Sequence, residues 1–167
     1  PSPNPQMGVD SRLRLGEEFH RLFAVTRPTQ ILTRESTGIA CALATAQSFG
    51  DLPLVFAKKT VPNTMVDDVY AAEVKSFTKG TISRAVVAKK FLTPQDAVLI
   101  IDDFLAHGEA ATGMCDIVRQ SGAQLLGMGA VIEKEVQGGG SRLREAGVRL
   151  ESLAVIRCIE DGVIHFR

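Results

Sequence analysis

The chain has 167 residues, of which 45% are hydrophobic and 23% charged, so it is long enough for one folded domain with a proper core. Its 19 basic and 19 acidic residues give a net charge of zero, which argues against bulk attraction to nucleic acid or to an anionic membrane. No apolar run approaches the roughly 18 residues of a membrane span, and the N-terminus lacks a signal-peptide pattern. Because the sequence starts with Pro rather than Met, we expect residues before it.

The cysteines, Cys41, Cys115 and Cys158, all have apolar neighbours and form no CxxC motif. Such a sparse, odd set predicts buried, reduced thiols in a cytoplasmic protein, with a reactive cysteine as the alternative. None of the three histidines shows ligand spacing with these cysteines.

The first half of the chain predicts alternating helices and strands. A helix begins at Asp10 or Ser11 and runs to Phe23, since its apolar residues recur at helical spacing. A short buried strand (29–33), a small-residue helix (39–49) and another strand (54–57) follow.

The second half begins with a polar stretch, 58–68, which we interpret as an exposed, mobile loop. The remaining expected elements follow in chain order: a two-stranded excursion (70–78 and 81–88), a buried strand (97–101), a helix (109–121), a strand (124–132), a Gly-rich turn (138–140), a short helix (142–146), a long strand (148–159) and a last strand (163–166). Alternating strands and helices predict an α/β sheet.

Charged residues are predicted just beyond four of these strands: Glu35, Lys58, Asp102 and Lys134. Ligands of open α/β sheets bind at the carboxyl ends of the strands. This convergence is the main purely physical indication of an active site.

The stretch from Val98 to Ala110 reads VLIIDDFLAHGEA. After its two acids come a turn that contains Gly108 and the start of a helix, whose first amides and dipole favour an anion such as phosphate. Asp102 and Asp103 would then accept hydrogen bonds from sugar hydroxyls, which together describes a ribose 5-phosphate site. The alternative interpretation is a solvated acid pair that caps a helix.

This stretch resembles the phosphoribosyl pyrophosphate (PRPP) signature of type I phosphoribosyltransferases. With further segments, in order ILTRESTGIA, VFAKK, VYAAEVKSFTK, GMGAVIEK and VRLESLAVIRCIEDGVIHF, the chain from about residue 4 resembles the xanthine phosphoribosyltransferases. The resemblance implies one domain over 1–167, with a mostly parallel twisted sheet flanked by helices, a small N-terminal hood whose first residues are missing, and a mobile loop with a two-stranded excursion. It also implies a cytoplasmic homodimer in purine salvage, which makes xanthosine monophosphate and pyrophosphate from xanthine and PRPP with Mg²⁺.

Site residues follow from the resemblance position by position. Catalytic roles fall on Asp102, Asp103 and Lys58, and the two aspartates would also hold magnesium, directly or indirectly. Xanthine-binding roles fall on Asn4 and on Lys134, a cation that selects oxopurines over adenine. PRPP-binding roles fall on two loops and a lysine: Glu35, Ser36, Thr37, Gly38, Lys59, Ala106, His107, Gly108, Glu109 and Ala110.

The sequence departs from the family pattern in the phosphate loop. His107 stands where the family often has Asn, and Glu109 where it often has Gln. A carboxylate at position 109 disfavours phosphate binding unless it points away from the phosphate. Two other functions stay open: a guanine or hypoxanthine phosphoribosyltransferase, and a PRPP-binding purine regulator without catalysis.

Overall fold

The computed structural model describes residues 9–60, 68–76, 80–160 and 163–167. The helices are α1 (Val9–Phe23), α2 (Gly38–Ser48), α3 (Glu109–Ser121) and α4 (Gly139–Glu145), with short 3-10 helices η1 (Lys89–Phe91) and η2 (Glu135–Gln137). The strands are β1 (Gln30–Arg34), β2 (Leu54–Thr60), β3 (Val69–Ser76), β4 (Thr81–Ala88), β5 (Ala97–Leu105), β6 (Gln124–Lys134), β7 (Leu150–Glu160) and β8 (Val163–Phe166).

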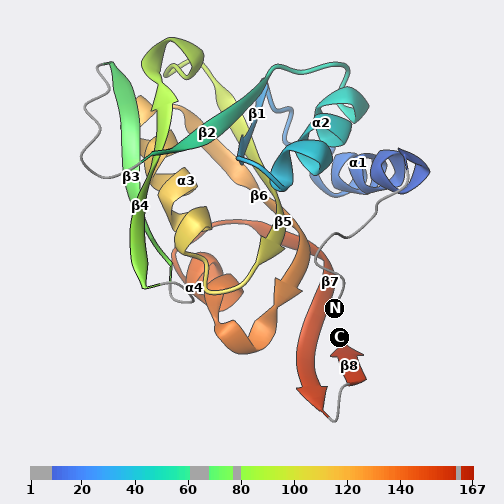
Figure 1. Cartoon of the computed structure of the whole chain (residues 1–167). Coiled ribbons are helices and arrows are strands. Elements are labelled where there is room, and N and C mark those ends of the chain that lie inside the picture. Colours follow the sequence, from blue (N-terminus) through green and yellow to red (C-terminus); the bar gives the residue numbers. More distant parts are fainter. Residues whose placement is uncertain (1–8, 61–67, 77–79, 161–162) are drawn as a thin grey trace.

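The strands form one sheet in the order β3-β4-β2-β1-β5-β6-β7-β8. The run from β2 through β1, β5 and β6 to β7 is parallel, whereas β4 pairs antiparallel with β2 and β3, and β8 pairs antiparallel with β7. In Figure 1 the β3–β4 pair lies at one edge of the sheet, and β7 reaches past the other strands to β8. The predicted mostly parallel α/β sheet is therefore confirmed.

The central strand β5 is buried on both faces, which explains its continuous apolar run. Val98 and Ile100 join a core that includes residues of α3, β3 and β4. Leu99 and Ile101 join a second core formed with α1 and α2. Successive strand side chains point to opposite faces, so helices cover both sides of the sheet, α1 and α2 on one and α3 on the other (Figure 1).

Several predicted boundaries were wrong because the strands continue for as long as a neighbouring strand pairs with them. β5 runs on to Leu105, pairing with β6 up to Glu133, so Asp102 and Asp103 lie inside the strand. β2 runs on to Thr60, so Lys58 belongs to a strand and the predicted loop does not start there. Lys134 is likewise the last residue of β6, and the predicted Gly-rich turn contributes the first turn of α4.

The predicted two-stranded excursion is confirmed by the antiparallel pairing of β3 with β4. The rest of the predicted mobile loop (61–67) and the N-terminal residues assigned to a hood (1–8) lie outside the described residues. Among the described helices, none is both long and apolar enough to cross a membrane.

Candidate active site

A cavity of about 470 Å³ lies at the carboxyl ends of β5 and β6, and β1, β2, β3 and β4 also contribute to its wall. It brings together eight of the residues predicted from the sequence: Lys59, Asp102, Ala106, His107, Gly108, Glu109, Ala110 and Lys134. Their convergence from three strands and one loop is what the sequence predicts for a ligand site at this end of an α/β sheet.

The loop 106–110 turns the chain from β5 into α3. Gly108 has a φ of 82°, in the left-handed region that favours glycine, and it forms the N-cap of α3. The Gly139 amide donates to the Ala106 carbonyl at 3.1 Å, and a Cβ on Gly139 would come within 2.3 Å of that oxygen. Glycine at 139 therefore lets α4 support the loop, while the first residues of α3 line the cavity. The amides at such a helix start have no partner within the helix, which favours an anion there.

Two residues of the loop contact Arg142 of α4. The guanidinium lies 3.8 Å from the carboxylate of Glu109 and donates a hydrogen bond to the carbonyl of His107. The acid at position 109, unfavourable beside a phosphate by itself, thus has a cationic partner.

Asp102 is the buried member of the acid pair, with 8% of its surface exposed. Burial, and then repulsion by Asp103, raise the pKa of Asp102 to about 7, while the nearby Arg34 opposes the shift. Its Oδ1 accepts the Asp103 amide at 3.0 Å. A Cβ at Gly38 would lie 2.8 Å from the same oxygen, so glycine is needed where α2 approaches the acid.

The loop from β1 to α2 borders a second, smaller cavity of about 210 Å³. Glu35, Thr37 and Asp103 line it, together with Asp102 and Ala110, which also line the larger cavity. The Glu35 carboxylate accepts the Lys59 amide at 2.6 Å and so ties this loop to β2. The two cavities therefore share part of their walls, and we treat them together as the candidate site.

Three predicted site residues line neither cavity: Ser36, Gly38 and Lys58. Lys58 and Lys59 are neighbours in β2, so their side chains point to opposite faces of the sheet, and only Lys59 lines the larger cavity. Asn4 lies outside the described residues.

Sequence reasoning missed Arg34 and Phe104, which line both cavities. Arg34 is the last residue of β1, where a charged side chain at a strand end was a usable signal. Phe104 is 46% exposed, but this exposure is visible only in the structure, so it could not have been used as a sequence signal. Lys75 of β3 lines the larger cavity as well, but its position depends on sheet pairing and gave no sequence signal.

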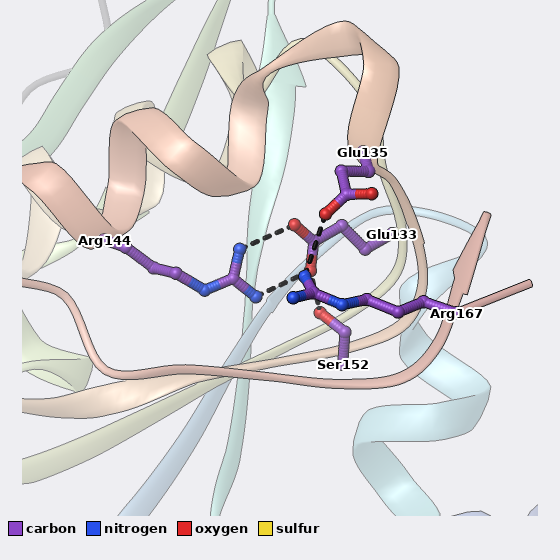
Figure 2. Close-up of polar contacts among 5 residues, drawn as sticks. All are labelled: Glu133, Glu135, Arg144, Ser152 and Arg167. Atoms are coloured by element: carbon purple, nitrogen blue, oxygen red, sulfur yellow. Dashed lines mark hydrogen bonds and ion pairs between the residues drawn. The ribbon is translucent and has the colours of Figure 1, made fainter. Parts of the chain in front are cut away.

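Lys134, the predicted base-selecting cation, lines the larger cavity and lies between two glutamates in sequence. Glu133 is 2% exposed and accepts hydrogen bonds from Arg144 and Ser152 (Figure 2). Glu135 forms an ion pair with Arg167. Hydrogen bonds from Arg144 are the main reason that the pKa of Glu133 is lowered.

Away from the cavities, Cys158 and His165 are paired across the β7–β8 hairpin, and their ligand atoms and that of Glu160 lie within 4.8 Å of one another. The absence of ligand spacing in the sequence does not exclude this proximity. Hairpin register, not spacing along the chain, brings them together. None of the three lines either cavity.

Comparison with known proteins identifies relatives along nearly the whole chain, although no family model matches it. Xanthine phosphoribosyltransferase of Geobacillus thermodenitrificans is 50% identical over 98% of this chain and 84% of its own length. That of Moorella thermoacetica is 50% identical over 98% and 83%. Among solved structures, adenine phosphoribosyltransferase of Giardia lamblia has a TM-score of 0.78 at 20% identity, covering 89% of this chain and 81% of its own.

The solved structure supports the fold, and the relatives support the family. The chain has the type I phosphoribosyltransferase fold and belongs to the xanthine phosphoribosyltransferase family of purine-salvage enzymes.

Proposed function

We propose that the cavity binds PRPP and xanthine together and transfers the phosphoribosyl group to the purine. The observation that carries the proposal is the convergence of a helix N-terminus, an acid pair with one buried member and Lys134 around two cavities that share wall residues. The identity of about half of all residues with named xanthine phosphoribosyltransferases supports the choice of substrates.

The sugar phosphate fits the loop 106–110. Backbone amides at the start of α3 have no partner within the helix and point at the 5-phosphate, so the replacement of individual loop side chains is tolerated. Arg142 balances the charge of Glu109, which keeps that carboxylate from repelling the phosphate.

The ribose and the pyrophosphate fit the acid pair and the smaller cavity. Asp102 and Asp103 accept the ribose hydroxyls, and the loop from Glu35 to Gly38, with Arg34 and Lys59, holds the pyrophosphate. The carboxylate oxygens of the two aspartates are hard donors of the kind that Mg²⁺ prefers. When bound, magnesium supplies positive charge against the departing pyrophosphate.

The purine fits between Phe104 and Lys134. The exposed ring of Phe104 offers an apolar face to a flat base. The Lys134 ammonium can donate only, so it favours an exocyclic oxygen over the amino group of adenine. Asn4, outside the described residues, adds a hydrogen bond to the base in this proposal.

In the reaction a ring nitrogen of xanthine attacks the anomeric carbon of PRPP and the bond from that carbon to the pyrophosphate oxygen breaks. The nitrogen loses its proton to solvent or to the pyrophosphate. Positive charge develops on the ribose, beside the carboxylates, and negative charge on the leaving group, beside Arg34 and Lys59. Side chains held in place beforehand stabilise both charges.

We further propose that the enzyme works as a homodimer in the cytoplasm. Cys41, Cys115 and Cys158 are free, which suits a reducing compartment. Cys41 and Cys115 are buried as predicted, whereas Cys158 is only half-buried, so the prediction of burial was wrong for it. The described β7–β8 hairpin exposes Ile159, Val163, Ile164 and Phe166, which offers apolar surface for a second copy.

The test is a nucleotide-formation assay with PRPP and Mg²⁺, to which xanthine, guanine, hypoxanthine and adenine are supplied one at a time. The proposal expects xanthosine monophosphate to form fastest and adenine to react least. A faster reaction with guanine or hypoxanthine would assign the chain to another oxopurine. PRPP binding without product from any base would indicate a regulator.

A further inference from the structure

The side chain of Glu133 is a buried carboxylate with a full set of partners. Arg144 of α4 donates to Oε1 at 2.7 Å and to Oε2 at 2.8 Å, and Ser152 of β7 donates to Oε2 at 2.5 Å (Figure 2). Such a bidentate guanidinium–carboxylate contact fixes the orientation of both side chains and balances their charges. Glu133 therefore joins β6, β7 and α4 at one point.

The backbone is arranged to make room for this contact. A Cβ on Gly140 would lie 1.8 Å from the Oε1 of Glu133, so any side chain at position 140 would displace the carboxylate. Glycine at this position in the first turn of α4 lets the helix close over Glu133.

Lys134, the next residue, lines the cavity, and successive strand side chains point to opposite faces. On its other side Glu135 is paired with Arg167 at 3.0 Å. Each neighbouring glutamate thus has an arginine partner, whereas Lys134 forms no ion pair in the part of the chain that the structure describes. The Lys134 ammonium remains available to a ligand.

We propose that the Glu133–Arg144 pair is a positioning device for Lys134 that sets base selectivity. It fixes the end of β6 against α4 and β7, and so it holds the backbone from which Lys134 reaches the cavity. This inference rests on the proposed function of the cavity. Arg144 and Glu133 are positioning residues, because they act through Lys134.

The test measures kcat and KM for xanthine, hypoxanthine and PRPP in Arg144→Met and in Arg144→Lys. In R144M the charge of Glu133 is left buried without its partner and displaces the end of β6 that carries Lys134, so the KM for xanthine rises about tenfold while the KM for PRPP stays within about twofold. The value of kcat/KM for xanthine divided by that for hypoxanthine falls. R144K keeps the positive charge but cannot donate two parallel hydrogen bonds to the carboxylate, so its KM for xanthine lies between those of wild type and R144M.

The double variant E133Q/R144M separates positioning from simple structural support. It removes the unpaired buried charge as well, so its KM for xanthine lies below that of R144M. Arg119→Met is the matched control, because Arg119 forms an exposed surface pair with Asp116 on α3. The control keeps the wild-type KM values. Thermal unfolding of each variant identifies those that are folded.

Three results would overturn the inference: an unchanged KM for xanthine in folded R144M, a parallel rise of both KM values, or a double variant as impaired as R144M. If wild type makes xanthosine monophosphate, these results leave the proposed function intact. A wild-type protein that makes no nucleotide from any base would overturn the proposed function and this inference together.

Discussion

Arg142 of α4 lies 3.8 Å from Glu109 of the phosphate loop, so the one acid in that loop is balanced by a residue more than thirty positions away in sequence. The same guanidinium donates to the His107 carbonyl. Arg142 thus supports this loop at two points, the backbone carbonyl of His107 and the side chain of Glu109.

Replacement of Arg142 by Met is expected to weaken PRPP binding. The freed Glu109 carboxylate repels the phosphate, so the KM for PRPP rises about three- to tenfold. The pair is partly exposed, so the free energy of unfolding changes by less than about 1 kcal/mol. Steady-state kinetics at varied PRPP check this, and E109Q/R142M recovers much of the affinity. A double variant no better than R142M would show that Glu109 repulsion is not the cause.

Replacement of Lys134 by Met is expected to remove the preference for oxopurines. The variant loses a charged hydrogen bond to the base, worth about 1.5–3 kcal/mol, so kcat/KM for xanthine falls roughly ten- to a hundredfold. The KM for PRPP stays close to the wild-type value. A base panel checks the prediction, and an unaltered ranking of bases in K134M would exclude Lys134 as the selecting cation.

Replacement of Asp102 by Asn is expected to stabilise the fold and abolish turnover. Asp102 is 8% exposed and lies against Asp103, so its charge is costly in the protein without substrates. Removing that charge raises the free energy of unfolding by about 1 kcal/mol at neutral pH, as happens when strained active-site groups are replaced. Urea unfolding and turnover are measured on the same preparation. Lower stability with retained turnover would contradict both parts.

The buried pair predicts a pH dependence of stability. Because the pKa of Glu133 is lowered from its usual value of 4.5, the pair stabilises the fold above that pH and loses its effect as pH falls through the folded-state pKa. E133Q is therefore less stable than wild type by about 1–2 kcal/mol near pH 7. The difference narrows as the pH falls below 4.5 and through the folded-state pKa. Urea unfolding at several pH values checks this, and a difference independent of pH would exclude ionisation of Glu133 as its source.

Local pattern was enough to predict the order of the elements. The apolar run of β5 and the helical spacing of α1 are strong signals, and α3 begins and ends at the predicted residues. Strand ends were harder to predict. Asp102 and Lys58 are polar, which suggests a loop, yet both remain in strands because a neighbouring strand pairs with them.

The residues that line the site were easier to predict from the sequence than the ion pairs that hold them in place. Asp102, Gly108 and Lys134 each stand in a local motif, and the structure places all three around the cavity. The partnerships of Arg142 with Glu109 and of Arg144 with Glu133 join distant segments. No pattern along the chain signals them, since they depend on where α4 packs.

The most direct test of the account is the rate of nucleotide formation from PRPP and Mg²⁺ with each of four bases. The account predicts rapid xanthosine monophosphate formation from xanthine, slower reaction with guanine and hypoxanthine, and very little with adenine. Equal or faster reaction with adenine would contradict the role of Lys134. Absence of product from every base would contradict the assignment of a xanthine phosphoribosyltransferase activity to this cavity.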